Sequence, residues 1–349
     1  MRVSFLVLLY NYFIVSSALQ CMNENNDPVD WLIVYKLPKL KHENKLIEDG
    51  VGYVYLSSKN TQWTFSKNSI NETNSIIATT LQPFYSRLNE TTYVLYNDQP
   101  PNGESNPSKG HTKGVILTNF ESGFWLIHSV PHFPTLTPRY QFSKSGTLKG
   151  QSFLCISMDL ENLNKVGIQL QYNQPQFYAS FVAPSVRDKI TEIVKAASGN
   201  TITKPPWYSK IVLNTRENVQ FTSFAKSKKF GKDLYEDWVA PVLQSSLLVE
   251  TWLNGAGRLP SNCTKMFKVY NIEKVSLNAA NASFSDTQDH SKWAVTNDSA
   301  WICIGDINRM NHQKFRGGGT VCLNNKPLAE NYRKSIASIE KCTHNLNYI

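Results

Sequence analysis

The stretch HTKGVILTNFESGFWLIHSVPHFP, residues 111–134, has a counterpart later in the chain, HSKWAVTNDSAWICIGDINR, residues 290–309. Each begins with His-x-Lys on a run of strand-forming residues, turns through polar residues and re-enters a strand at a tryptophan, Trp125 or Trp301. A triplet of this length is a weak motif by itself, but a shared strand–turn–strand context is harder to obtain by chance. A third triplet, HQK at 312–314, leads into a glycine-rich loop and lacks this context. The two long stretches therefore form a weak internal repeat.

The spacing within the triplet suits phosphate chemistry. On a strand, residues i and i+2 point to one face about 6–7 Å apart, so His111 and Lys113 can address one phosphate together, as can His290 and Lys292. Lysine supplies charge for the phosphate oxygens, and imidazole can attack phosphorus or transfer a proton. Two such strands facing each other would suffice for phosphodiester cleavage without a metal. The competing interpretation, exposed strand histidines beside solvated lysines, stays open on the motif alone.

Short apolar and aromatic runs bounded by turn residues extend this pattern along the chain. Many are apolar on both faces, as strands buried between helix layers would be. Helical periodicity and capping residues predict helices at 185–200, 232–244 and 332–342. This interleaving predicts a mixed α/β architecture, divided near residue 200 into two halves with one His-x-Lys each. The predicted strands are 31–37, 92–98, 114–119, 123–129, 152–158, 246–253, 292–296 and 300–306.

The N-terminal segment and the cysteines indicate the secretory pathway. Residues 1–18 combine Arg2, an apolar run and small residues before a cut, which predicts a signal peptide. No later stretch is long and apolar enough to predict a transmembrane segment. An even number of cysteines in an oxidising compartment predicts disulfides, and Asn-x-Ser/Thr sequons predict glycosylated surface loops. The cysteines are Cys21, Cys155, Cys263, Cys303, Cys322 and Cys342, and the sequons are at Asn71, Asn89, Asn262, Asn281 and Asn297.

The formal net charge of +9 suits a polyanionic partner, either nucleic acid or an acidic membrane surface. Two features have two interpretations each. Lysines interleaved with aromatic residues at 221–235 fit a nucleic-acid groove or a solvated helix start over a core. The glycines at 317–319 fit a backbone approach to phosphate or a plain tight turn.

Longer segments carry a family resemblance through nearly the whole mature chain. They are VDWLIVYKLP (29–38), VLYNDQPP (94–101), GHTKGV (110–115), GFWLIHSVPHFP (123–134), SFAKSKKFGKDLY (223–235), LPSNC (259–263), DHSKW (289–293), GDINR (305–309) and RGGGT (316–320). On these segments the sequence closely resembles the deoxyribonuclease II family, acid endonucleases of the phospholipase D-like superfamily.

The resemblance implies a pseudo-dimer of two related halves, 19–200 and 201–349, each a sheet flanked by helices. The active site would lie at their junction, with His111 and Lys113 from one half and His290 and Lys292 from the other. The activity it implies is metal-independent, cofactor-free cleavage of double-stranded DNA to 3′-phosphate and 5′-hydroxyl ends through a phosphohistidine. The protein would be secreted or lysosomal, and either a monomeric pseudo-dimer or a homodimer.

Within this site we assign His111 as the nucleophile and His290 as the general acid, with the reverse order open. Asn308, His132 and His128 are the supporting residues. For His128 a structural role behind the site competes with direct catalysis. The resemblance also implies the disulfides Cys21–Cys155, Cys263–Cys342 and Cys303–Cys322.

The sequence departs from the family pattern at two places. Asn119 stands where family members usually have Asp, and His132 stands where they usually have Asn. If the Asp orients a catalytic histidine, its replacement would slow the reaction. The alternative function is therefore a catalytically weakened secreted protein of this family that binds DNA or a host partner.

Overall fold

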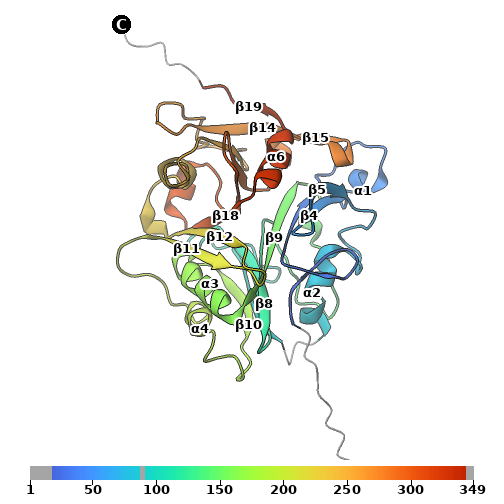
Figure 1. Ribbon diagram of the computed structural model, residues 1–349, viewed down its shortest axis with the longest axis vertical. Helices are drawn as coiled ribbons and strands as arrows, with labels where there is room; N and C mark the ends of the chain where they lie inside the picture. The colour runs from blue at the N-terminus through green and yellow to red at the C-terminus, as the bar shows by residue number, and fades with distance from the viewer. Residues whose placement is uncertain (1–17, 87–90, 343–349) are drawn as a thin grey trace, which may run out of the picture.

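The computed structural model describes residues 18–86 and 91–342 (Figure 1). The predicted signal peptide, apart from Ala18, and the sequon at Asn89 lie outside the described residues. The described part contains two large sheets and six α-helices, which confirms the predicted mixed α/β class.

The first sheet is built entirely from residues before 182, and each neighbouring pair of its strands is antiparallel. A small ribbon of β1 (Cys21–Met22) and β2 (Pro28–Val29) lies beside it. The helices of this part are α1 (Lys45–Glu48), α2 (Ile76–Ser86), α3 (Leu160–Asn173) and α4 (Thr191–Ala197), with the short 3₁₀ helix η1 (Lys144–Gly146). The strand order is β10 (Phe177–Phe181), β6 (Thr92–Asn97), β7 (Lys113–Thr118), β8 (Ser122–His128), β9 (Gln151–Asp159), β3 (Trp31–Lys36), β4 (Tyr53–Ser57) and β5 (Asn60–Phe65).

The second sheet comes from residues after 207, and among its described pairs only β13 and β14 run parallel. Its order is β11 (Tyr208–Asn214), β12 (Gln220–Lys226), β18 (Gly318–Asn324), β17 (Trp301–Gly305), β16 (Trp293–Thr296), β13 (Leu247–Glu250), β14 (Val269–Leu277) and β15 (Ala282–Ser285), with β19 (Ile336–Ile339) on β14. The helical segments are η2 (Lys228–Phe230), η3 (Tyr235–Val239), α5 (Ala240–Leu243), η4 (Asn278–Ala280), η5 (Asp286–Gln288), η6 (Asn311–Phe315) and α6 (Lys326–Lys334).

All eight predicted strands are confirmed, whereas two of the three predicted helices are confirmed only in part and the third is wrong. The segment 232–244 is helical over η3 and α5. In 185–200 only α4 is helical, and its N-cap residue, Ile190, makes no side-chain capping bond. The helix predicted at 332–342 is wrong, because α6 ends at Lys334 and β19 follows on the edge of β14.

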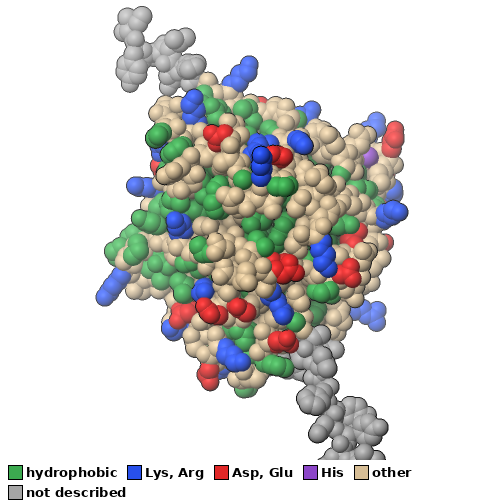
Figure 2. All heavy atoms as spheres, viewed as in Figure 1, with side chains coloured by type: hydrophobic (Ala, Val, Ile, Leu, Met, Phe, Trp, Pro, Cys, Tyr) green, Lys and Arg blue, Asp and Glu red, His purple; other side chains and the backbone are tan. Residues whose placement is uncertain are grey.

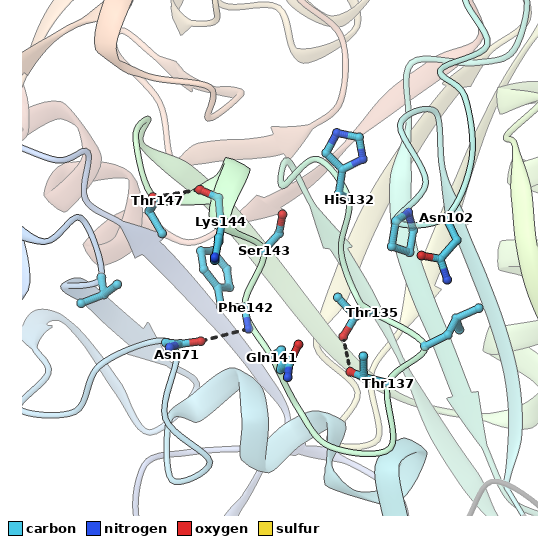
Figure 3. A pocket seen from close by; sticks show the side chains of 13 residues that line it. Asn71, Asn102, His132, Thr135, Thr137, Gln141, Phe142, Ser143, Lys144 and Thr147 are labelled. Carbon is cyan, nitrogen blue, oxygen red and sulfur yellow. Dashed lines mark hydrogen bonds between the residues drawn. The ribbon is translucent and has the colours of Figure 1, made fainter.

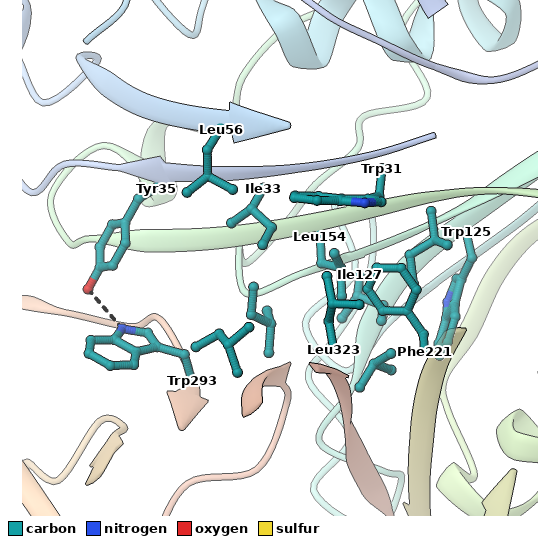
Figure 4. Packing of buried hydrophobic residues seen from close by; sticks show 14 of the residues in the cluster. Trp31, Ile33, Tyr35, Leu56, Trp125, Ile127, Leu154, Phe221, Trp293 and Leu323 are labelled. Carbon is teal, nitrogen blue, oxygen red and sulfur yellow. Dashed lines mark hydrogen bonds between the residues drawn. The ribbon is translucent and has the colours of Figure 1, made fainter. Parts of the chain in front are cut away.

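The two sheets face each other across one apolar core (Figure 4). Trp31 and Leu154 of the first sheet pack with Phe221 of the second, and all three are nearly fully buried. The outer face of the first sheet is covered by α2, and that of the second by the aromatic side of η3. The strands are therefore apolar on both faces. The inner face of each sheet packs against the other sheet and against α3 and α6, and the outer face is covered by α2 or η3.

The described cysteines form three disulfides, Cys21–Cys155, Cys263–Cys342 and Cys303–Cys322, which are the pairs that the resemblance implies. Within the described ranges, no helix combines the length and apolar character needed to cross a membrane. On the face shown in Figure 2, lysine and arginine side chains are scattered among polar and apolar atoms and form no single stripe.

Candidate active site

His111 lies just before β7 and is held by two backbone carbonyls from the second half of the chain, those of Gly317 and Asp306. Its N–H donates to the carbonyl of Gly317 at 2.8 Å. The preceding Gly110 has no room for a side chain, since a Cβ there would lie 1.8 Å from the carbonyl oxygen of Asn173. His111 Nδ1 lies 2.6 Å from the carbonyl oxygen of Asp306. Because a carbonyl only accepts, Nδ1 carries the proton, and Nε2 of the neutral ring keeps its lone pair.

Lys113 is the first residue of β7 and is buried with a carboxylate partner. Its Nζ donates to Asp98 Oδ1, and the side chains of both residues are about 5% exposed. Arg316 reaches the other oxygen of Asp98 at 3.0 Å, from the second half of the sequence. Burial alone would raise the pKa of Asp98, but Lys113, His111 and Arg316 together hold it below its ordinary value. The carboxylate therefore stays charged in acid and balances part of the positive charge beside His111.

His290 precedes β16, and its backbone N–H donates to Gly150 at 2.9 Å. Its ring meets Trp252 edge to face, with centroids 4.2 Å apart. Lys149 lies over the same indole, 5.0 Å from the ring centroid. Lys292 Nζ turns back to the carbonyl oxygen of His290 at 2.5 Å. Each histidine thus lies just before its strand, because β7 begins at Lys113 and β16 begins at Trp293. The sequence had predicted the triplets on the strands themselves.

A buried polar network lies under His290 and joins the two sheets. Asp289, which is fully buried, accepts hydrogen bonds from the hydroxyls of Tyr35 on β3 and Ser291. Tyr35 also accepts from the indole N–H of Trp293 at 3.4 Å, as Figure 4 shows. Because burial raises the cost of an unsatisfied polar group, these bonds hold the loop before β16 against β3.

The electrostatic contacts show that the two triplets converge. Burial lowers the pKa of His111 well below its ordinary value, and the charges of Lys113 and Lys292 lower it further against the opposing effect of Asp98. Burial and the charges of Lys292 and Lys113 lower the pKa of His290 to about 3. The pKa of each histidine is therefore lowered by the lysine of the opposite half. Burial and Lys113 also lower the pKa of Lys292 to about 7. The site concentrates positive charge, so an anion bound there would stabilise the protonated forms.

Asp306 ties the two halves together at this point. Its carboxylate accepts from Thr112 Oγ1 at 2.8 Å, while its carbonyl holds His111. Burial raises the pKa of this carboxyl to about 7. His111 therefore depends for its orientation on a residue from the opposite half of the chain.

A hollow of about 570 Å³ opens beside His111, and we call it the catalytic hollow. Asn308, one of the proposed supporting residues, lines it and is buried, with its Oδ1 unpaired among the described residues. His312 of the discarded HQK triplet lines it too, as an exposed side chain. It therefore belongs to the wall of the hollow, although its triplet lacks the strand context. Trp252, Asp98, Gln99 and Arg316 line other parts of the hollow.

The structure separates the other two supporting residues from this hollow. His132 lines a neighbouring hollow, with its Nδ1 2.9 Å from the carbonyl oxygen of Pro100. His128 is buried behind the site at the end of β8, where its ring packs against Phe133 and Phe153. Burial, with a contribution from Lys113, lowers the pKa of His128 to about 3.

Asn119 lies at the β7–β8 turn, where its Oδ1 accepts from the backbone of Glu121 and Ser122. The six-residue strand β7 puts about 17 Å between this turn and Lys113. The side chain at this position therefore cannot orient His111, so this departure from the family pattern does not bear on the histidine. The carboxyl group nearest to Lys113 is instead that of Asp98.

Within the lysine-rich and glycine-rich segments, Lys226 and Gly317 have structural roles. Lys226 is buried, and its Nζ donates to the carbonyls of Gln313, Lys314 and Arg316, so it holds the loop that lines the catalytic hollow. A Cβ on Gly317 would lie 2.1 Å from the carbonyl oxygen of Asn173. The glycine run therefore lets the two halves pack closely.

Sequence reasoning missed Asp98, Arg316, Asp306 and Trp252 as members of the site. Asp98, Asp306 and Arg316 do lie inside segments that carry the resemblance, which was the available signal. Across residues 18–86 and 91–342, no group of three or more His, Cys, Asp or Glu side chains is arranged to hold a metal ion.

Two facing sheets with paired histidines and lysines at their junction define a mixed α/β protein with a positively charged site between its halves. The family model described as deoxyribonuclease II matches residues 20–342. Plancitoxin-1 of Acanthaster planci is 41% identical, over 94% of each chain. Deoxyribonuclease-2-alpha of Rattus norvegicus is 34% identical over 97% of this chain and 99% of its own, and deoxyribonuclease-2-beta of Homo sapiens is 34% identical over 98% and 97%. The chain belongs to the deoxyribonuclease II family.

Proposed function

We propose that this protein is an endodeoxyribonuclease that hydrolyses double-stranded DNA at acid pH without a metal ion or cofactor, leaving 3′-phosphate and 5′-hydroxyl ends. Membership of the family, whose relatives are named deoxyribonucleases, supports the substrate. The observation that carries the mechanism is the 2.6 Å contact between His111 Nδ1 and the carbonyl oxygen of Asp306. It leaves Nε2 as a lone-pair donor among the charges of Lys113 and Lys292.

In the first step, His111 Nε2 attacks phosphorus and forms an N–P bond while the P–O5′ bond breaks. Protonated His290 gives its proton to the departing O5′, which leaves as a 5′-hydroxyl. Lys113 and Lys292 balance the charge on the other phosphate oxygens. In the second step, neutral His290 takes a proton from water, the water oxygen attacks phosphorus, and the N–P bond breaks to release the 3′-phosphate.

The lowered pKa of His111 supports its role as the nucleophile. His111 stays neutral in acid because burial and two lysines disfavour its charged form, as a nucleophile requires. His290 must gain a proton, although its pKa in the ligand-free protein is about 3. A phosphodiester among the lysines adds negative charge and raises that pKa, so substrate binding and protonation are coupled. Acid conditions favour the coupled step.

The direct test is plasmid nicking by the secreted protein near pH 5 in EDTA. Nicks bearing 3′-phosphate ends, together with a phosphohistidine trapped on the peptide that contains His111, are the expected result. A phosphohistidine on the peptide that contains His290 would reverse the two roles. DNA binding without nicking would instead support the alternative, a catalytically weakened member of the family.

We also propose that residues 19–200 and 201–349 are two related halves. In each, a His-x-Lys triplet leads into an antiparallel hairpin, β7–β8 or β16–β17. The proposed division falls between α4 and β11. A protein of this kind would be complete as a monomer, and light scattering of the purified protein would separate this state from a homodimer.

Entry into the secretory pathway, toward secretion or the lysosome, is part of the same proposal, and the disulfides support it. Among the proposed glycosylation sites, Asn71, Asn281 and Asn297 are exposed. Asn262 is half-buried, and its amide nitrogen donates to Glu236 at 2.8 Å. Peptide mapping after enzymatic deglycosylation would identify which sites carry glycans.

A further inference from the structure

A second hollow, of about 760 Å³, lies next to the catalytic hollow, and we call it the His132 hollow (Figure 3). The backbone N–H of His132 donates to the carbonyl of Gln99 at 2.8 Å. Gln99 lines the catalytic hollow and His132 lines the second one. The two hollows are therefore separated by one layer of backbone.

The chain itself limits the distance between them. Gln99 borders the catalytic hollow and Pro101 borders the His132 hollow, two residues further along. Two extended residues span at most about 7 Å. One strand of duplex DNA rises about 3.4 Å per nucleotide, so this distance corresponds to about two nucleotides. His111 also lines the catalytic hollow, so a strand that runs from there past Gln99 meets the wall of the His132 hollow about two nucleotides beyond Gln99.

The lining of the His132 hollow suits a nucleotide. None of its thirteen described lining residues carries a carboxylate, and its basic side chains are those of Lys144 and His132. His132 Nδ1 faces the carbonyl of Pro100 and so carries a proton, whereas Nε2 has no hydrogen-bond partner among the described residues. Amides of Asn102 and Gln141 offer both donors and acceptors, and Leu136, 43% exposed, offers apolar surface.

These residues match the parts of a nucleotide. Lysine neutralises phosphate, amide side chains and an imidazole Nε2 pair with base edges, and an exposed leucine covers the face of a base. A carboxylate in the wall would repel the phosphate, and the wall has none.

We propose that the His132 hollow is a subsite for a nucleotide that flanks the scissile phosphate on the same DNA strand, with Lys144 facing its phosphate and His132 Nε2 accepting a hydrogen bond from its base. This inference rests on the proposed function, because it takes DNA as the substrate. His132 is thus a binding residue of the subsite, and the departure from the family pattern at this position changes how flanking DNA is bound rather than the chemistry at His111.

The test compares Lys144→Glu with Lys274→Glu, which reverses an exposed lysine on β14 and changes net charge equally. Two substrates are used: a short double-stranded oligonucleotide and a p-nitrophenyl nucleotide phosphodiester that has no flanking nucleotide. We expect Lys144→Glu to raise KM for the oligonucleotide while kcat/KM for the small substrate stays unchanged. The ratio of the variant's oligonucleotide KM to that of the wild type should be about fourfold larger at 50 mM than at 200 mM salt, because one phosphate contact is lost. Lys274→Glu should show none of this.

Equal oligonucleotide KM values for the two variants would overturn the subsite. If the wild-type protein cuts neither substrate, the proposed function fails. Fluorescence anisotropy then measures the affinity for the same uncut oligonucleotide, which tests the subsite without cleavage. Unchanged affinity in Lys144→Glu refutes the subsite, and weakened affinity supports it.

A glycan is the other candidate occupant, because the sequon residue Asn71 stands at the rim and its Oδ1 accepts from the backbone of Phe142. The variant Asn71→Gln should bind the oligonucleotide at least as well as the wild type. A loss of stability in Asn71→Gln, together with unchanged DNA binding in Lys144→Glu, would assign the hollow to the glycan and overturn the proposal.

Discussion

Replacing Asp98 by Asn should destabilise the protein, because this carboxylate is the buried partner of two cations. The Lys113 and Asp98 side chains are 5% and 6% exposed, and Arg316 adds a contact of 3.0 Å. Removing one partner of a buried pair costs about 3–5 kcal/mol, and the amide oxygen that remains favours the lower end. A loss of about 3 kcal/mol lowers Tm by about 6–12 °C, given about 2–4 °C per kcal/mol for domains of 150–250 residues. Thermal unfolding at fixed scan rate and pH measures this change.

The pH dependence gives the prediction a second part. The pKa of Asp98 lies below its ordinary value of 3.8 in the folded protein, so the stability that it contributes is fully present above about pH 4. That stability is lost only as pH falls through the folded pKa. The difference in Tm between wild type and Asp98→Asn should therefore be constant from neutral pH down to about pH 4.5 and shrink in stronger acid.

A matched control is available in the exposed pair of Lys45 and Asp49, whose side chains are 73% and 47% exposed at a distance of 2.8 Å. Asp49→Asn should change the stability little, because solvent screens such a pair. In the double variant with Lys113→Met, the cost of Asp98→Asn should fall, since the lysine then needs no partner. A Tm loss in Asp98→Asn no larger than in Asp49→Asn would refute the buried ion pair and its role beside His111.

Three further predictions concern the histidine site and the packing around it. His290→Ala should reduce nicking by about 10²–10⁴-fold with unchanged Tm and with DNA binding unchanged at neutral pH, and near-normal nicking would remove His290 from the mechanism. Because the pKa of His290 is about 3 in the free protein, kcat/KM should fall as pH rises above about 3, while the fall in kcat should come at higher pH. If kcat/KM and kcat fell over the same pH range, this result would contradict the coupling of protonation to phosphate binding. Gly317→Ala would place Cβ 2.1 Å from the carbonyl oxygen of Asn173, so it should cost about 1–3 kcal/mol in chemical unfolding. Gly103→Ala, whose Cβ would meet no atom closer than 3.2 Å, is its control, and equal stabilities would speak against close packing at Gly317.

The sequence by itself determined the strands, the family and the residues of the two His-x-Lys triplets. Strand positions could be predicted because each depends on a short apolar run and the turn residues that bound it. The helix predicted at 332–342 failed because β14 offers an unpaired edge, and pairing with it outweighs a local helical pattern at β19. Helical propensity is a weak local preference that tertiary contacts override.

Only the tertiary structure decided how the site is completed. Asp98 reaches Lys113 across 15 residues, and Asp306 reaches His111 across 195, so no local spacing could predict either contact. The same holds for His132, whose backbone bond to Gln99 places it in the neighbouring hollow. Side-chain chemistry and strand periodicity are written in short stretches of sequence. Which carboxylate neutralises Lys113 depends on the pairing of β6 with β7. Which carbonyl orients His111 depends on how the two sheets pack, because Asp306 comes from the other half of the chain.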